Sequence, residues 1–202
     1  GLYKVYNNNL LYHGCIPLNE DGSFKSVKIY GRSYKGKALY EVLESYVRKG
    51  FYAIDEKERK RGKDMMWYIW LSENSPLFGK DKMATFERYF LAEKETHKEK
   101  KNPYYDFLEN DKVVDRILKE FGLEHSFSHI INGHMPVKSK NGENPMKCGG
   151  KVFVIDGGFS RAYQKQTGIA GYTLIYNSYG MILSAHEPFE SKESAIENET
   201  DI

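Results

Sequence analysis

Residues 10–15 read Leu-Leu-Tyr-His-Gly-Cys, a short apolar run that stops at a histidine and a glycine. Residues 130–134 repeat the pattern as Ile-Ile-Asn-Gly-His. Such runs are typical of strands that end in loops. In α/β folds, ligands collect beyond the carboxyl ends of strands, and a neighbouring glycine allows close backbone approach. We therefore expect two strands that carry His13 and His134 to one site, where imidazoles could reach a shared metal.

Amphipathic helices are expected between these strands. Apolar residues recur at helical spacing over residues 39–47, and Gly50 is expected to end that helix. A second helix is expected from Asp111, with Gly122 in the position of a C-terminal cap. A third is expected to carry the apolar residues within 83–90. Two charged stretches without apolar periodicity, residues 55–64 and 93–101, are expected to be solvated loops or exposed helix faces.

The remaining elements are expected to be strands. The continuous apolar run at residues 66–71 predicts a buried strand. After Pro145, strands are predicted at residues 152–155, 172–176 and 181–183, and the four-residue Asn-Ser-Tyr-Gly loop between the last two predicts a hairpin. The expected fold class is therefore α/β, in the α+β sense, with a β-rich C-terminal part.

Composition limits the possible classes of protein. The 202 residues are 40% hydrophobic, with a formal net charge of +2, which suits a folded domain. No apolar stretch approaches the roughly 20 residues that span a membrane, so no membrane contact is expected. No arginine-rich or aromatic RNA-binding motif is present, so no nucleic-acid partner is expected. The two cysteines, Cys15 and Cys148, form no disulfide framework, and a cytoplasmic location is expected.

Charge divides the chain into two parts. Residues 187–202 hold six acidic residues and one lysine, which predicts a mobile acidic tail after a basic body at residues 1–186. The basic body would suit an anionic substrate such as a phosphate ester. The chain begins at Gly1 with neither an initiator Met nor a leader, so we expect a fragment or a processed chain.

Two further segments could bind anions. Residues 154–158 read Val-Ile-Asp-Gly-Gly, which is typical either of a tight turn or of a strand end that presents backbone N–H groups to a phosphate. In the second case, Arg161 and Lys165 would add charge-assisted contacts. Residues 75–82 form a predicted loop in which Lys80 and Lys82 could bind an anion or could simply be solvated.

Several of these segments together resemble one family. Residues 11–17, 74–90, 132–137 and 155–172 are similar to class 3 fructose-1,6-bisphosphatases of Gram-positive bacteria, which belong to the calcineurin-like metallophosphoesterases. The resemblance implies an αββα sandwich with a two-metal site, usually manganese, that removes the 1-phosphate of fructose 1,6-bisphosphate in gluconeogenesis. By motif, His13 and His134 match the two histidine metal ligands from the C-terminal half of that fold.

The chain also departs from the family pattern. The N-terminal Asp-x-His, Gly-Asp-x-x-Asp-Arg and Gly-Asn-His-Glu segments are absent, and with them most metal ligands and the expected general acid. Two histidines cannot hold two ions, and no catalytic residue is assigned here. We expect a C-terminal portion that is inactive alone, with the missing N-terminal half as its partner and with possible homo-oligomers. Lys80, Lys82, Arg161 and Lys165 are predicted to contact substrate phosphate, by charge and loop position.

Two other functions remain open. The basic body and the Asp-Gly-Gly strand end would suit a regulatory module that binds phosphate or a nucleotide. Alternatively, the chain could belong to a phosphoprotein phosphatase of the same superfamily. Metal-independent ligand binding would favour the first, and turnover of a phosphopeptide would favour the second.

Overall fold

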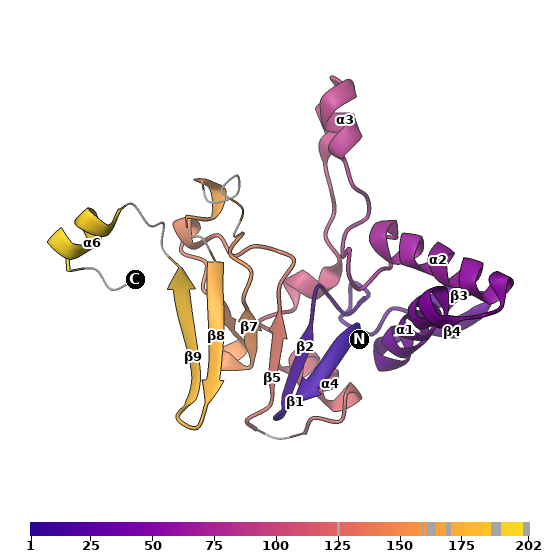
Figure 1. Ribbon diagram of the computed structural model, residues 1–202, viewed down its shortest axis with the longest axis horizontal. Helices are drawn as coiled ribbons and strands as arrows, with labels where there is room; N and C mark the ends of the chain where they lie inside the picture. Colours follow the sequence, from indigo (N-terminus) through magenta and orange to yellow (C-terminus); the bar gives the residue numbers. More distant parts are fainter. Residues whose placement is uncertain (125, 159, 161–164, 169–170, 187–190, 200–202) are drawn as a thin grey trace.

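A computed structural model describes the chain except for residues 125, 159, 161–164, 169–170, 187–190 and 200–202. It confirms the expected mixture of helices and strands. Figure 1 shows a central sheet, a pair of helices beside it, a projecting arm and a C-terminal hairpin. Within the described part of the chain, no helix is both long and apolar enough to cross a membrane.

The central sheet has five strands in the order β1-β2-β5-β7-β6. Their bounds are β1 Tyr3–Tyr6, β2 Asn9–Tyr12, β5 His129–Asn132, β6 Met146–Lys147 and β7 Val152–Val154. The inner strands β2, β5 and β7 are parallel, whereas β1 and β6 are antiparallel to their neighbours. Leu10, Ile130 and Val152 are in register across the inner strands and are fully buried. The predicted strands at the two histidine motifs are thus confirmed as neighbours.

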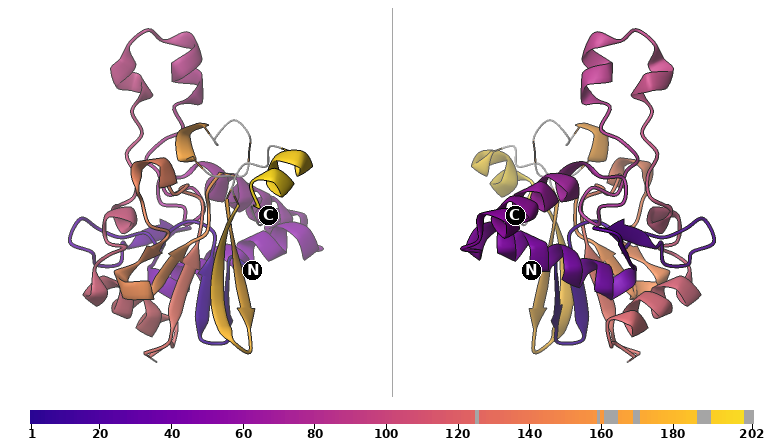
Figure 2. Two further views of the ribbon diagram at one scale, coloured as in Figure 1. Left: turned by 90° about the vertical axis from the view of Figure 1, so that its left-hand side faces the viewer. Right: turned by 90° about the vertical axis from the view of Figure 1, so that its right-hand side faces the viewer.

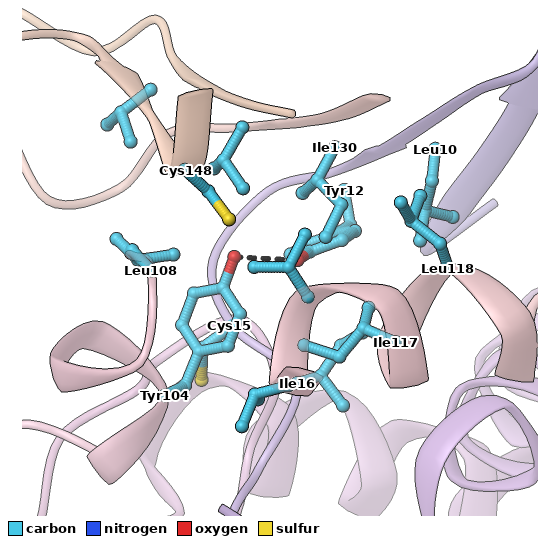
Figure 3. Packing of buried hydrophobic residues seen from close by; sticks show 14 of the residues in the cluster. Leu10, Tyr12, Cys15, Ile16, Tyr104, Leu108, Ile117, Leu118, Ile130 and Cys148 are labelled. Carbon is cyan, nitrogen blue, oxygen red and sulfur yellow. Dashed lines mark hydrogen bonds between the residues drawn. The ribbon is translucent and has the colours of Figure 1, made fainter. Parts of the chain in front are cut away.

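Helix α4 (Asp111–Glu120) covers one side of this sheet. The Asn110 side chain caps its first turn by accepting the Val113 N–H. At its end Gly122 has φ +80°, and the Leu123 N–H donates to the Leu118 carbonyl at 2.9 Å, which is the expected glycine cap. Figure 3 shows α4 side chains packed against the strands, beside the hydrogen bond of 2.6 Å that joins Tyr12 to Tyr104.

Helix α2 (Glu56–Leu71) shows that the predicted strand at residues 66–71 is wrong. Asp55 caps the helix by accepting the Glu58 N–H, and the helix then continues through the charged stretch into the apolar run. An unbroken apolar run has no periodicity that would separate a helix from a strand. Only the start of the helix at Asp55, before the run, could have distinguished the two. The run is also not wholly buried, since Trp67 and Trp70 are 68% and 67% exposed.

Helix α1 (Gly36–Tyr52) extends two residues beyond Gly50, its predicted end. Gly50 instead lies where α1 crosses α2, because a Cβ on Gly62 would come within 2.1 Å of the Gly50 nitrogen. The pair of helices has its own core with a small hairpin of β3 (Val27–Ile29) and β4 (Arg32–Tyr34). That core contains Val27, Ile29, Leu39, Leu43, Met65 and Ile69.

Residues 80–101 form an arm that projects from the body (Figures 1 and 2). A bridge between Lys80 and Lys101 closes its base, and it carries α3 (Thr85–Phe90) and the 3-10 turn η1 (Lys94–His97). The predicted third helix is confirmed for Phe86 and Phe90, which are 72% and 78% exposed, whereas Met83 precedes it. We call residues 80–101 the arm below.

The C-terminal part contains the predicted hairpin. Strands β8 (Gly171–Asn177) and β9 (Gly180–His186) pair up to Asn177 and Gly180, so its turn has two residues rather than the expected four. The Tyr172 hydroxyl joins the hairpin to the body through Ser139 at 2.6 Å. Within the acidic segment, α6 spans Lys192–Glu197. The other 3-10 turns are η2 Pro103–Asp106, η3 Ser139–Asn141 and η4 Cys148–Gly150.

Candidate functional site

The structure brings His13 and His134 together. The Nε2 atom of His13 lies 3.0 Å from the Nδ1 atom of His134, although 121 positions separate them in the chain. They meet because β2 and β5 are parallel neighbours whose carboxyl ends share one edge of the sheet. The expected juxtaposition is confirmed.

Backbone contacts between the two strand ends hold this geometry. The Gly133 N–H donates to the His13 carbonyl at 2.9 Å, and the buried Asn132 amide donates to the Gly14 carbonyl at 3.1 Å. A Cβ at position 14 would lie 2.5 Å from the Pro76 carbonyl oxygen, so Gly14 is required for the loop before the arm to pack here. His134 itself has φ +65°, a strained conformation for a residue with a side chain.

The hydrogen bonds determine the tautomers of both rings. The Nε2 atom of His134 is 2.7 Å from the Phe78 carbonyl oxygen. A carbonyl can only accept, so His134 carries its hydrogen on Nε2 and keeps a lone pair on Nδ1. That lone pair then accepts the Nε2–H of His13. The two nitrogens that face each other are therefore Nε2 of His13 and Nδ1 of His134.

Burial lowers the pKa of His134, and the charge of Lys80 lowers it further, whereas the hydrogen bond to Phe78 and the charge of Asp156 act in the opposite direction. The net effect is a pKa below that of a free imidazole, which is about 6.5. His134 is therefore neutral at pH 7 and able to donate a lone pair.

The facing nitrogens fit two ligands of one metal ion. Two bonds of about 2.1 Å at a right angle place their nitrogens about 3 Å apart, which matches the 3.0 Å separation. Binding requires His13 to move its hydrogen from Nε2 to Nδ1. Among the described residues, no group of three or more His, Cys, Asp or Glu side chains is placed to hold a metal. A complete metal centre therefore needs ligands beyond these two.

A cavity of about 540 Å³ opens beside the histidines and is lined by both of them. Lys80, Arg88 and Glu99, all from the arm, contribute its charged groups, and Trp70 contributes part of its apolar wall. Glu99 accepts from Lys80 Nζ at 2.8 Å and lies 3.1 Å from Arg88 Nη2. The cavity thus joins the two imidazoles to a charged cluster at the base of the arm.

Lys82 and Lys165, two other predicted phosphate contacts, do not line this cavity. Lys82 donates to the Thr96 carbonyl at 2.7 Å, inside the arm. Lys165 is exposed on a helical turn at residues 165–167 and does not line the cavity, and Arg161 lies outside the described residues. Asp156 accepts the Gly158 N–H at 2.8 Å, as in the tight turn that was one of the two interpretations of this segment.

Sequence reasoning missed three residues of this cavity: Trp70, Arg88 and Glu99. Trp70 was assigned to a strand, which hid its position on the last turn of α2. Arg88 lies in the segment 74–90 that carries the family resemblance, but no role was predicted for it, and Glu99 lies eleven positions further along the chain. Only the fold of the arm brings the two side chains together. Glu99 lies in the charged stretch 93–101, which was predicted to be solvated surface, so the sequence did not indicate that it lines a cavity.

Comparison with known proteins extends over the whole chain. A family model described as Firmicute fructose-1,6-bisphosphatase matches residues 1–202. Similar relatives are named fructose-1,6-bisphosphatase class 3, from Clostridioides difficile at 62% identity over 202 residues and from Clostridium tetani at 58% over 202 residues. Each alignment covers 100% of this chain but only 31% and 30% of the respective relative.

The chain therefore spans about a third of the length of these relatives. No solved structure matches it. The match to the family model over all 202 residues confirms the resemblance carried by the histidine, arm and Asp-Gly-Gly segments, and the chain belongs to the Firmicute fructose-1,6-bisphosphatase family.

Proposed function

We propose that this chain supplies part of the metal and substrate site of a fructose-1,6-bisphosphatase, which hydrolyses fructose 1,6-bisphosphate to fructose 6-phosphate and phosphate. The contact of 3.0 Å between His13 Nε2 and His134 Nδ1 carries the proposal, since it brings together two ring nitrogens that could both bind one metal ion once His13 holds its hydrogen on Nδ1. The names of the similar proteins support the activity. The reaction would belong to gluconeogenesis, in the cytoplasm.

Each residue of the site has a distinct part in this proposal. His13 and His134 would hold a divalent metal, proposed to be manganese in a two-metal site. When bound, the metal supplies Lewis-acid stabilisation of the negative charge that develops on the reacting phosphate. Phe78 keeps the hydrogen of His134 on Nε2, so that Nδ1 faces the ion. Lys80 brings positive charge to the same cavity.

The remaining metal ligands and the general acid would come from the other part of a longer polypeptide. We propose that this part completes an αββα sandwich with the sheet described here. A chain with two imidazole ligands cannot hold two metal ions, so the 202 residues alone are expected to be inactive.

A chimeric protein tests the proposal. These 202 residues would replace the matching 31% of the Clostridioides difficile relative, and manganese-dependent phosphate release from fructose 1,6-bisphosphate would be measured. The chimera should be active, and H134A should lower its turnover at least about 100-fold because an ion loses a ligand. The matched control is H97A, because His97 lies on the arm outside the cavity lining and its ring nitrogen lies 3.0 Å from the Leu91 carbonyl oxygen.

Other outcomes would identify the competing functions. Normal turnover by the H134A chimera would overturn the assignment of this ligand. Preferred turnover of a phosphopeptide would favour a phosphoprotein phosphatase. Binding of phosphorylated ligands without metal dependence, together with an inactive chimera, would favour a regulatory module.

A further inference from the structure

We propose that Lys80 and Arg88 form a second anion subsite, which binds the phosphate of a sugar bisphosphate that does not react. The proposal rests on the proposed function and extends it from the reacting phosphate to the recognition of the whole substrate. It adds Arg88, for which no role was predicted from the sequence, and it assigns the base of the arm a role in choosing bisphosphates over monophosphates.

The two cations are held close together at the cavity. Lys80 Nζ is 2.8 Å from Glu99 Oε2, and Arg88 Nη2 is 3.1 Å from Glu99 Oε1. The side chains of Lys80 and Glu99 are only 27% and 13% exposed, so this cluster is partly withdrawn from water. Each oxygen of the Glu99 carboxylate faces one cation. Two oxygens of a phosphate could contact the lysine and the arginine in the same way.

The cluster carries more positive than negative charge. One carboxylate stands against two cations, all three line the cavity, and the two histidines add no negative charge. Burial acts to raise the pKa of Glu99, but hydrogen bonds from Lys80 and the Ala84 N–H hold it below its usual value, so Glu99 is ionised at pH 7. A dianionic phosphate that displaces Glu99 would match the charge of the two cations.

The subsite lies within reach of the metal-binding histidines. Lys80 lines the same cavity as His13 and His134, and its charge acts on the His134 imidazole. The lining of the same cavity also includes Trp70 and other apolar side chains, which suit the carbon skeleton of a sugar that carries two phosphates. A ligand with charge at both ends and a less polar centre therefore fits this arrangement.

Binding can be followed through Trp70, which lines the cavity. The chain contains two tryptophans, so a W67F background leaves Trp70 as the single fluorescent reporter. Fructose 1,6-bisphosphate, fructose 1-phosphate and inorganic phosphate would be titrated without metal. The bisphosphate should bind more tightly than either monophosphate, and K80A and R88A should each weaken its binding about tenfold. Inorganic phosphate, which without metal can occupy the same subsite, should also bind more weakly to both variants.

Controls on the arm separate recognition from structure. Lys98 pairs with Glu95 on the same arm, where both side chains are exposed, so K98A should leave all three affinities unchanged. E99Q keeps an acceptor for the Ala84 N–H but removes the charge that competes with phosphate. If the cluster binds anions, E99Q should bind the bisphosphate several-fold more tightly, whereas a purely structural ion cluster predicts equal or weaker binding.

The outcomes distinguish this proposal from the proposed function. Equal bisphosphate affinity in K80A, R88A and the parent, or no bisphosphate binding to the parent, would overturn the subsite. The same variants in the chimera should raise KM for fructose 1,6-bisphosphate but not for fructose 1-phosphate. An active chimera whose KM values do not change in K80A and R88A would support the phosphatase proposal and refute the subsite. Bisphosphate binding that K80A and R88A weaken, together with an inactive chimera, would support the subsite and refute the phosphatase proposal.

Discussion

In the proposed site His134 would bind the metal through Nδ1, because another residue occupies its second nitrogen. The Phe78 carbonyl accepts the Nε2–H at 2.7 Å, which leaves Nδ1 with its lone pair. The acceptor that fixes the hydrogen of His134 on Nε2 is a backbone carbonyl, so a side-chain substitution at position 78 does not remove it. The strained φ of +65° at His134 is maintained because several surrounding contacts hold the residue in place.

The tautomers of the two rings can be measured directly. In the metal-free chain, nitrogen NMR of labelled histidine should show the hydrogen on Nε2 in both His13 and His134. Manganese is paramagnetic, so zinc would serve as the NMR probe, and His13 should then carry its hydrogen on Nδ1. A hydrogen on Nδ1 of His134 in the metal-free chain would contradict the assignment.

His129 provides a pH dependence of stability away from the site. Burial lowers its pKa, and its Nδ1 lies 3.0 Å from the Asn9 side-chain oxygen. Below a pH of about 6.5 the unfolded chain takes up a proton before the folded chain does, so stability should fall as pH decreases from there. In H129Q, where the amide can donate to Asn9, the decrease in unfolding free energy between pH 7 and 5 should be smaller. Equal slopes in chemical denaturation would contradict this.

At the scale of elements, one close contact sets the geometry of α1 and α2. A Cβ on Gly62 would lie 2.1 Å from the nitrogen and 2.3 Å from the Cα of Gly50, both rigid backbone atoms. The helices therefore approach more closely than any side chain would permit. Their position matters for the site, because Trp70 on the last turn of α2 forms part of the cavity wall.

Substitution of Gly62 should test this contact. G62A should lower the free energy of unfolding by about 2–3 kcal/mol, because the added methyl group forces the helices apart despite the better helix propensity of alanine. K63A, at an exposed position of the same helix, is the control and should change stability by less than about 0.5 kcal/mol. Denaturant unfolding would measure both, and a G62A variant as stable as K63A would refute the close crossing.

At the scale of the whole molecule, the described residues form two buried clusters and an arm. The larger cluster joins the inner strands to α4, the smaller one lies between α1, α2 and the β3–β4 hairpin, and α3 on the arm buries no residue. Local stability follows the number of buried contacts, so these parts should open separately.

Hydrogen exchange should resolve these parts. Amides of Ile130 and Ile131 in β5 should exchange most slowly, those in the buried turns of α1 and α2 at an intermediate rate, and those of α3 fastest. Added fructose 1,6-bisphosphate should slow exchange in the arm if the anion subsite is correct. Uniform protection across all three regions would contradict the division into separate units.

Local sequence patterns were sufficient for much of the fold. The strand ends at His13 and His134, helix α4 with its glycine cap and the β8–β9 hairpin were all predicted from spacing and turn residues, because short-range backbone preferences determine such features. The same patterns failed at residues 66–71, where an unbroken apolar run is compatible with either a helix or a strand. The two histidines were expected at one site because ligands collect beyond the carboxyl ends of strands, whereas the parallel pairing of β2 and β5 comes from the structure.

Only the tertiary structure decided which distant groups act together. It placed the Phe78 carbonyl on His134, brought Arg88 and Glu99 to the cavity, left Lys82 inside the arm and set Gly62 against Gly50. Each of these contacts joins residues separated by 11 to 56 positions or depends on how whole elements pack. Sequence spacing carries no information on such contacts, since they result from burying one surface of the chain against another.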